Sequence, residues 1–69
     1  MKLEIGIRIR ELRKIIGLTQ TQLAKQIKTT QDTVSLWERG KSYPNVESII
    51  LLCTTFNVSA DYLLGLTDF

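Results

Sequence analysis

The sequence predicts an all-α domain built from five short helices. Hydrophobic residues recur at the three- and four-residue steps of a helix face, and a Ser, Thr or Asn stands where four of the helices would begin. A glycine follows three of the predicted helices. The chain has 69 residues, of which 43% are hydrophobic and 23% charged, so we expect one small globular domain, residues 1–69.

The first two helices are predicted from apolar spacing and from a capping box. One face of the first helix, over about residues 4–16, carries four apolar side chains: Ile5, Ile9, Leu12 and Ile16. Gly17 ends this helix. Thr19 with Gln22 three residues later has the form of a capping box, which predicts a second helix that directs Leu23, Ala24 and Ile27 inward and ends near Lys28.

A third helix of about nine residues is predicted between Thr30 and Gly40. Thr30 is a candidate N-cap, and Val34 and Trp37 lie on the inward face. Only Lys28 and Thr29 then separate the second and third helices. Two helices joined by so short a turn are typical of a helix-turn-helix unit, whose second helix can enter the major groove of DNA.

The last two helices follow Asn45 and Ser59, which are both candidate N-caps. The fourth helix carries six apolar residues: Val46, Ile49, Ile50, Leu52, Cys53 and Phe56. Because these residues cover more than half of its circumference, we expect this helix to be central and mostly buried. The fifth helix is a short turn over residues 60–64 that Gly65 ends.

Composition excludes most catalytic and metal chemistry. The chain has no His and one Cys, so a His/Cys zinc site, a Ser-His-Asp triad and an internal disulfide cannot be built. We expect no enzyme activity, no cofactor and no small-molecule substrate. Cys53 follows Leu51 and Leu52 and is expected to be a small core hydrophobe in a reducing compartment. The longest apolar run, residues 49–53, is too short to span a membrane, so a cytoplasmic protein is expected.

Charge is distributed unevenly along the chain. Residues 1–41 hold all nine basic side chains and four of the seven acidic ones, a net charge of +5, whereas residues 42–69 carry −3. Such asymmetry indicates that the basic part of the chain faces a polyanion and that the acidic part has another role. An ordinary solvated charged surface is the alternative explanation.

The order and spacing of several short segments resemble the Cro and phage-repressor class of helix-turn-helix regulators, also called Xre-type. The matching segments are residues 6–13 (GIRIRELR), residues 17–20 (GLTQ), Leu23 with Ala24, Val34, residues 37–41 (WERGK), Pro44 and residues 58–65 (VSADYLLG). The resemblance covers residues 6–65. It implies a five-helix domain that binds a specific site on double-stranded DNA and regulates transcription, with repression the expected effect and bacteria or their phages the expected source.

The exposed amino end and outer face of the third helix carry the residues that we expect to contact bases: Thr30, Gln31, Asp32, Ser35 and Leu36. Gln can pair with adenine through two hydrogen bonds, Ser and Thr bond several bases, and Leu packs on the methyl group of thymine. Leu36 has an alternative interpretation as an ordinary surface leucine. Asp32 could accept from cytosine, oppose a phosphate, or complement the helix amino terminus.

Four further residues are candidates for contacts to DNA phosphates: Gln20, Arg39, Lys41 and Ser42. Their alternatives are a simple capping residue for Gln20 and a charged solvated turn for the others. The resemblance also implies a structural salt bridge between Arg13 and Glu38. The sequence departs from the family at Lys28, because a Gly is common in this turn and a left-handed Lys would cost roughly 1 kcal/mol.

One short helix contacts few base pairs, so we expect a homodimer on a palindromic operator. The acidic and apolar carboxyl end supplies the candidate dimer interface: Tyr62, Leu66 and Phe69. The alternative function is that of an antitoxin or accessory protein-interaction module, whose main partner binds this same surface.

Overall fold

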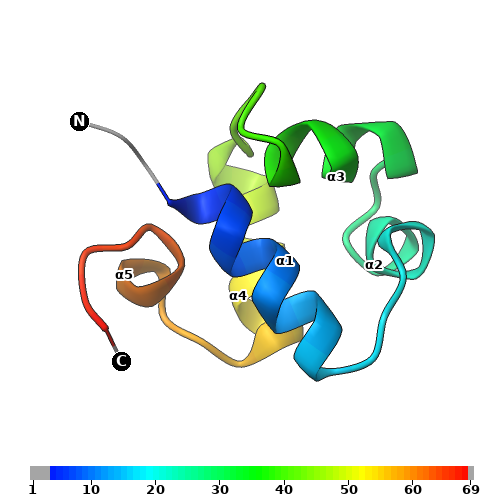
Figure 1. The fold of residues 1–69 in the computed structure, drawn as a ribbon. Helices are drawn as coiled ribbons and strands as arrows, with labels where there is room; N and C mark the ends of the chain where they lie inside the picture. The colour runs from blue at the N-terminus through cyan, green and yellow to red at the C-terminus, as the bar shows by residue number, and fades with distance from the viewer. Residues whose placement is uncertain (1–3, 69) are drawn as a thin grey trace.

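A computed structural model describes residues 4–68. It contains five α-helices, α1 (Ile5–Ile15), α2 (Gln20–Gln26), α3 (Gln31–Glu38), α4 (Val46–Phe56) and α5 (Ala60–Leu63), and no strand within the described residues (Figure 1). The predicted fold class and the order of the helices are therefore confirmed. None of these helices is long and apolar enough to cross a membrane.

All four predicted N-caps form. The hydroxyl of Thr19 accepts from the backbone N–H of Gln22 at 3.1 Å, and the Gln22 side chain accepts from the backbone N–H of Thr19 at 2.8 Å, which completes the capping box. The other three caps accept from the backbone N–H three residues further on, at 3.3, 2.8 and 3.1 Å: Thr30, Asn45 and Ser59. Local side-chain chemistry therefore fixes where four of the five helices begin.

The turn between α2 and α3 contains a left-handed lysine. Lys28 has φ 61°, and its N–H donates to the carbonyl of Lys25 at 3.4 Å, while the N–H of Thr29 donates to the carbonyl of Ala24 at 2.9 Å. This pair of bonds is a Schellman motif with Lys in the position that usually holds Gly. Because α2 already ends at Gln26, residues 27–30 join the two helices, and the two-residue turn expected from the sequence was too short.

Lys28→Gly should stabilise the fold by up to about 1 kcal/mol, because glycine adopts φ 61° without the clash of a β-carbon. Urea titration followed by the fluorescence of Trp37 would measure the change. Lys28→Ala is the matched control, since it removes the same charge but keeps the β-carbon, and it should bring no such gain. A lower stability for Lys28→Gly would contradict the strain assigned to this turn.

The hydrophobic core is shared by all five helices. Its buried members are Ile5, Ile9, Leu23, Ala24, Ile27, Val34, Trp37, Leu52, Phe56 and Leu63. The helix α1 packs against α3, α4 and α5, and α2 packs against α3 (Figure 1). The helices α1 and α3 approach closely at Gly6, which is buried, because a β-carbon at this position would overlap the carbonyl oxygen of Trp37. A glycine in the first helix therefore sets the distance between α1 and α3.

Two expectations about burial were wrong. Ile16, assigned to the apolar face of the first helix, is 45% exposed, because the helix ends at Ile15 and the chain turns away at Gly17. The helix α4 is not mostly buried, since Val46 is 74% and Ile50 60% exposed. In a chain this short, α1 and α5 cover only one side of α4, so its other side remains in solvent.

Cys53 packs partly buried against the core, and this burial raises the pKa of its thiol. A thiol with a raised pKa holds less of the nucleophilic thiolate form at neutral pH. The side chain therefore acts as a small hydrophobe, in keeping with the sequence analysis.

Candidate nucleic-acid interface

The helix α3 is anchored by one face and exposed on the other. Val34 is fully buried and Trp37 is 4% exposed, so these two side chains hold the helix on the core. Gln31, Asp32 and Leu36 point to solvent, with Leu36 38% exposed. In Figure 1, α3 lies at the opposite side of the molecule from the carboxyl-terminal segment. The exposed face of α3 is thus free to enter the groove of a nucleic acid.

A buried ion pair joins α1 to α3. The Arg13 guanidinium donates to both carboxylate oxygens of Glu38, through Nε at 2.7 Å and Nη2 at 3.0 Å, and its Nη1 donates to the carbonyl of Leu18 at 2.8 Å. The side chains are only 11% and 4% exposed. Hydrogen bonding to Glu38 raises the pKa of Arg13, although burial lowers it. The structure thus brings together the two residues that the resemblance paired, in bidentate geometry.

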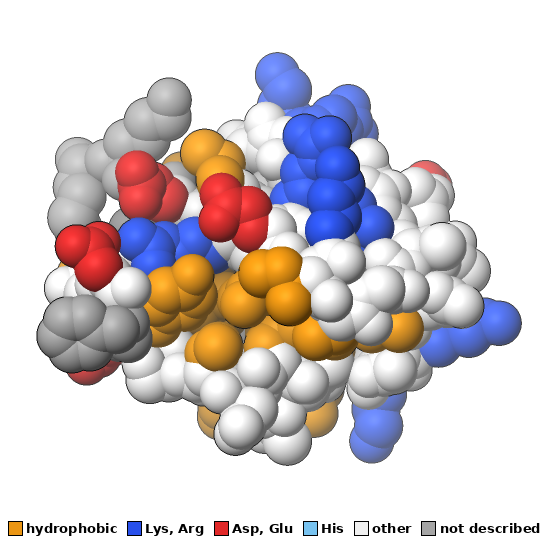
Figure 2. All heavy atoms as spheres, turned by 60° about the horizontal axis from the view of Figure 1, so that its bottom comes forward, with side chains coloured by type: hydrophobic (Ala, Val, Ile, Leu, Met, Phe, Trp, Pro, Cys, Tyr) orange, Lys and Arg blue, Asp and Glu red, His pale blue; other side chains and the backbone are white. Residues whose placement is uncertain are grey.

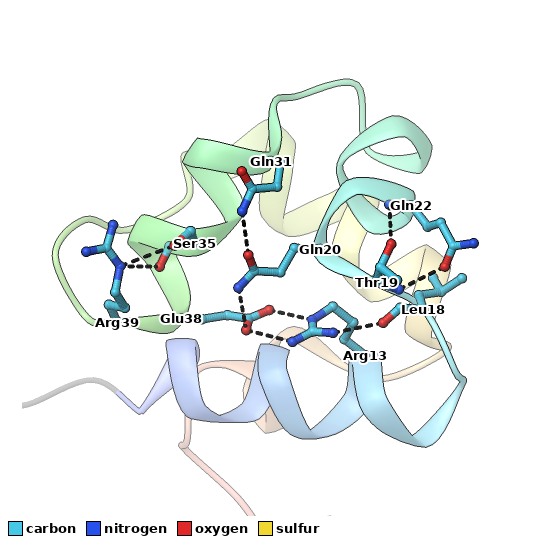
Figure 3. Close-up of polar contacts among 9 residues, drawn as sticks. All are labelled: Arg13, Leu18, Thr19, Gln20, Gln22, Gln31, Ser35, Glu38 and Arg39. Atoms are coloured by element: carbon cyan, nitrogen blue, oxygen red, sulfur yellow. Dashed lines mark hydrogen bonds and ion pairs between the residues drawn. The ribbon is translucent and has the colours of Figure 1, made fainter.

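A chain of hydrogen bonds runs from this ion pair to the exposed face of α3 (Figure 3). The Glu38 carboxylate accepts from Nε2 of Gln20 at 3.1 Å, and Oε1 of Gln20 accepts from Nε2 of Gln31 at 2.7 Å. Because a carboxylate only accepts, it fixes the orientation of the Gln20 amide and then that of Gln31. Gln31 is left with its carbonyl oxygen and one N–H unused, which are the two groups that pair with adenine.

The sequence did not predict this series of hydrogen bonds, because Gln20 belongs to α2 whereas Gln31 and Glu38 belong to α3. Gln20 lies 18 residues from Glu38 and 11 residues from Gln31. The one sequence feature that Gln20 and Gln31 share is that each is the first residue of its helix. Gln20, predicted to contact a phosphate, orients a predicted base-contacting residue in the free protein.

The remaining predicted DNA contacts lie around the same helix. The hydroxyl of Thr30 caps α3 and lies 2.9 Å from the hydroxyl of Thr33, so the cap already uses part of its bonding capacity. Ser35 accepts from Nε of Arg39 at 3.2 Å. Lys41 is exposed and Ser42 half-buried in the segment after α3. Of the predicted base contacts, Asp32 and Leu36 are exposed without such a bond, and Gln31 is exposed with its amide held by Gln20.

At the carboxyl end, Arg8 holds the chain against α1. Its guanidinium lies 4.5 Å from the ring centre of Tyr62, donates to the carbonyl of Thr67 at 3.2 Å, and lies 3.6 and 3.8 Å from the carboxylates of Glu4 and Asp68. Of the predicted dimer residues, Tyr62 is half-buried under Arg8 and Leu66 is 62% exposed. Phe69 lies outside the described residues. The sequence analysis missed Arg8, whose contact with Thr67 spans 59 residues.

Next to Tyr62 the surface is apolar. Figure 2, which brings the bottom of Figure 1 forward, shows a band of hydrophobic side chains across this face. A groove of about 540 Å³ opens here between α1 and the segment that joins α4 to α5, lined by Leu12, Asn57, Val58, Ser59 and Tyr62. Ile15, near the end of α1, is 78% exposed. The carboxyl-terminal surface therefore includes exposed apolar groups.

The fold and this site together define a class of protein. Two short helices joined by a tight turn, the second anchored by one face and exposed on the other, form a helix-turn-helix unit. The family model described as helix-turn-helix matches residues 9–63. The chain belongs to this family, and its similarity to the repressor of phage P22 confirms the Cro and phage-repressor type.

The proteins to which this chain is similar include regulators of several kinds. BcrR, a transcriptional activator of Enterococcus faecalis, is 40% identical over 63 residues, which are 91% of this chain and 31% of BcrR. The c2 repressor of Salmonella phage P22, solved in complex with a synthetic operator, is 37% identical with a TM-score of 0.84 over 87% of this chain and 91% of that one. The restriction-modification controller protein C.AhdI of Aeromonas hydrophila is 32% identical with a TM-score of 0.78, covering 87% of each chain.

The chain spans about a third of BcrR and about half of ImmR, a regulator from Bacillus subtilis. Its likeness to these relatives is therefore a likeness to their helix-turn-helix portion.

Proposed function

We propose that this protein binds a specific site on double-stranded DNA through the exposed face of α3 and regulates transcription from it, without enzymatic activity of its own. The observation that carries the proposal is the hydrogen-bond chain from Glu38 through Gln20 to Gln31. A surface glutamine ordinarily loses rotamer freedom when it binds a base. Here the two protein hydrogen bonds fix the amide before DNA arrives, which favours discrimination between bases.

The similarity to the P22 repressor supports repression as the proposed effect. The P22 protein is a repressor and was solved on an operator, whereas BcrR is an activator. A protein that occupies a site overlapping a promoter excludes the polymerase without needing any further domain. We therefore propose repression in the cytoplasm of a bacterial host, to be tested by transcription in vitro from a promoter that carries the selected site.

We further propose that two copies bind together on a palindromic operator. The helix α3 offers few free base-contacting side chains, so a single copy would specify too few base pairs. The exposed Leu66 and the apolar groove beside Tyr62 support the carboxyl-terminal surface as the contact between copies. Selection from random duplex DNA would test specific binding and binding by two copies. A protein that binds as a dimer selects a palindrome, whereas a monomer selects a single half-site.

Substitutions on α3 and after it should separate base contacts from phosphate contacts. Gln31→Ala and Leu36→Ala should each cost about 1 to 3 kcal/mol on the operator and little on scrambled duplex, because base edges carry the sequence information. Lys41→Ala should weaken binding to both duplexes and reduce the slope of log K against log salt by about one unit. Titrations of the three variants on both duplexes at several salt concentrations would measure these effects.

The contrast between the variants is the decisive result. Equal losses on operator and scrambled DNA for Gln31→Ala and Leu36→Ala, or no loss at all, would remove α3 as the recognition helix. A protein partner at the carboxyl-terminal surface would then become the better explanation of this fold.

A further inference from the structure

A second groove lies beside the recognition helix, on the side that faces α1. It has a volume of about 230 Å³ and is lined by Arg10, Arg13, Gln20, Ser35, Glu38 and Arg39. Three helices and the residue that follows α3 contribute to it. Sequence analysis gave Arg10 no role, because nothing in the chain near position 10 relates it to position 39.

The charges in this groove do not balance. Its one carboxylate, Glu38, is already neutralised by the bidentate ion pair with Arg13 and also accepts from Gln20. Within residues 4–68, Arg10 and Arg39 form no ion pair. Two guanidinium groups therefore line one small groove without an opposing charge, an arrangement that an anion between them would stabilise.

The donors on the α3 side are held in place. Nε of Arg39 donates to the carbonyl oxygen of Ser35 at 3.4 Å and to its hydroxyl oxygen at 3.2 Å, so the side chain lies back along α3 (Figure 3). The two terminal nitrogens of Arg39 remain available as donors. Because the Ser35 hydroxyl accepts from Arg39, its own hydrogen is also free to donate.

We propose that Arg10 and Arg39 together bind one phosphate of the DNA backbone in this groove, with Ser35 positioning Arg39. The inference rests on the proposed function. The paired, planar guanidinium groups match the tetrahedral oxygens of a phosphodiester better than a single lysine would. Ser35, expected from the sequence to contact a base, then acts through Arg39.

The position of the groove gives this phosphate contact its importance. Gln20 lines the groove and also holds Gln31, so the phosphate site and the base-contacting amide share one structural support. A phosphate contact carries no sequence information, but it fixes the register of the protein along the duplex. Binding in this groove therefore sets which base pair lies opposite Gln31.

The test measures binding of the full chain to operator and scrambled duplex at several salt concentrations. Arg10→Ala and Arg39→Ala should each weaken binding to both duplexes by about three- to tenfold and lower the salt slope by about one unit. Lys25→Ala is the matched control, because it removes the same charge from an exposed position on α2 outside the groove. This control should retain the affinity and salt slope of the unmodified protein.

If Arg10 and Arg39 share one phosphate, the effects of the two substitutions should not be independent. The double variant Arg10→Ala/Arg39→Ala should lose less affinity than the product of the two single losses, since both changes remove the same contact. A methylphosphonate linkage, which removes the charge of one DNA phosphate, should weaken the unmodified protein at one position per half-site. The double variant should be insensitive to the linkage at that position.

Several results would overturn the inference, and they differ from failure of the proposed function. If the unmodified protein binds duplex DNA and Arg10→Ala behaves like Lys25→Ala, the groove holds no backbone phosphate. Fully multiplicative losses would mean two separate contacts. If the unmodified protein binds no duplex even at low salt, the proposed function fails with the inference.

Discussion

Arg13→Ala will destabilise the fold by about 3 to 5 kcal/mol, because it leaves the Glu38 carboxylate buried without its partner. Glu38 is 4% exposed and would retain only its bond to Gln20. The same substitution removes the bond from Arg13 to the carbonyl of Leu18, which fixes the chain between α1 and α2. A domain of this size has roughly 3 to 5 kcal/mol of stability, so most of the variant should be unfolded at room temperature.

Urea titration would measure this effect, with the single Trp of the chain, Trp37, as the fluorescent probe. Arg10→Ala is the matched control, since it removes the same charge from an exposed position on the same helix and should change the stability by less than about 0.5 kcal/mol. Replacing both partners by apolar residues, Arg13→Met with Glu38→Leu, should restore most of the loss. Equal midpoints for Arg13→Ala and Arg10→Ala would contradict a structural role for the ion pair.

Local patterns in the sequence predicted most of the fold. Each cap at Thr19, Thr30, Asn45 and Ser59 depends on a side chain and the N–H groups of the next turn, so the sequence contains the whole interaction. The burial of α4 depends on which helices cover it. The apolar pattern of α4 fits a helix that is covered on all sides and also a helix that is covered on one side only. The structure shows the second arrangement, in which Val46 and Ile50 are exposed.

The sequence predicted which residue types form the candidate site, but it did not predict which of them contact one another. The exposed face of α3 follows from the inward spacing of Val34 and Trp37, which sequence analysis identified. The bonds of Gln20 depend on the packing of α2 against α3, and the groove beside Arg10 depends on the distance between α1 and α3. That distance is set by Gly6, whose position within a helix is the one sequence signal of a close backbone approach.

Gly6→Ala should destabilise the fold by about 3 kcal/mol or more, although alanine favours a helix over glycine by about 1 kcal/mol. The added methyl carbon would overlap the carbonyl oxygen of Trp37 and lie 3.0 Å from its carbonyl carbon and 3.3 Å from Cα of Glu38. These are backbone atoms of α3, which cannot rotate away as a side-chain end would. The two helices must separate, and the Arg13 to Glu38 ion pair between them must lengthen.

Gly17→Ala is the matched control for this substitution, because the same methyl group at Gly17 meets nothing within 4 Å. Its cost should be about 1 kcal/mol, from the left-handed backbone at φ +79° alone. Urea titrations of both variants would compare a packing clash with backbone strain. Because separation of α1 from α3 also moves Arg10 away from Arg39, any folded Gly6→Ala should bind the operator more weakly, whereas Gly17→Ala should keep its affinity. Equal stability losses for the two variants would mean that α1 and α3 are not in close contact at Gly6.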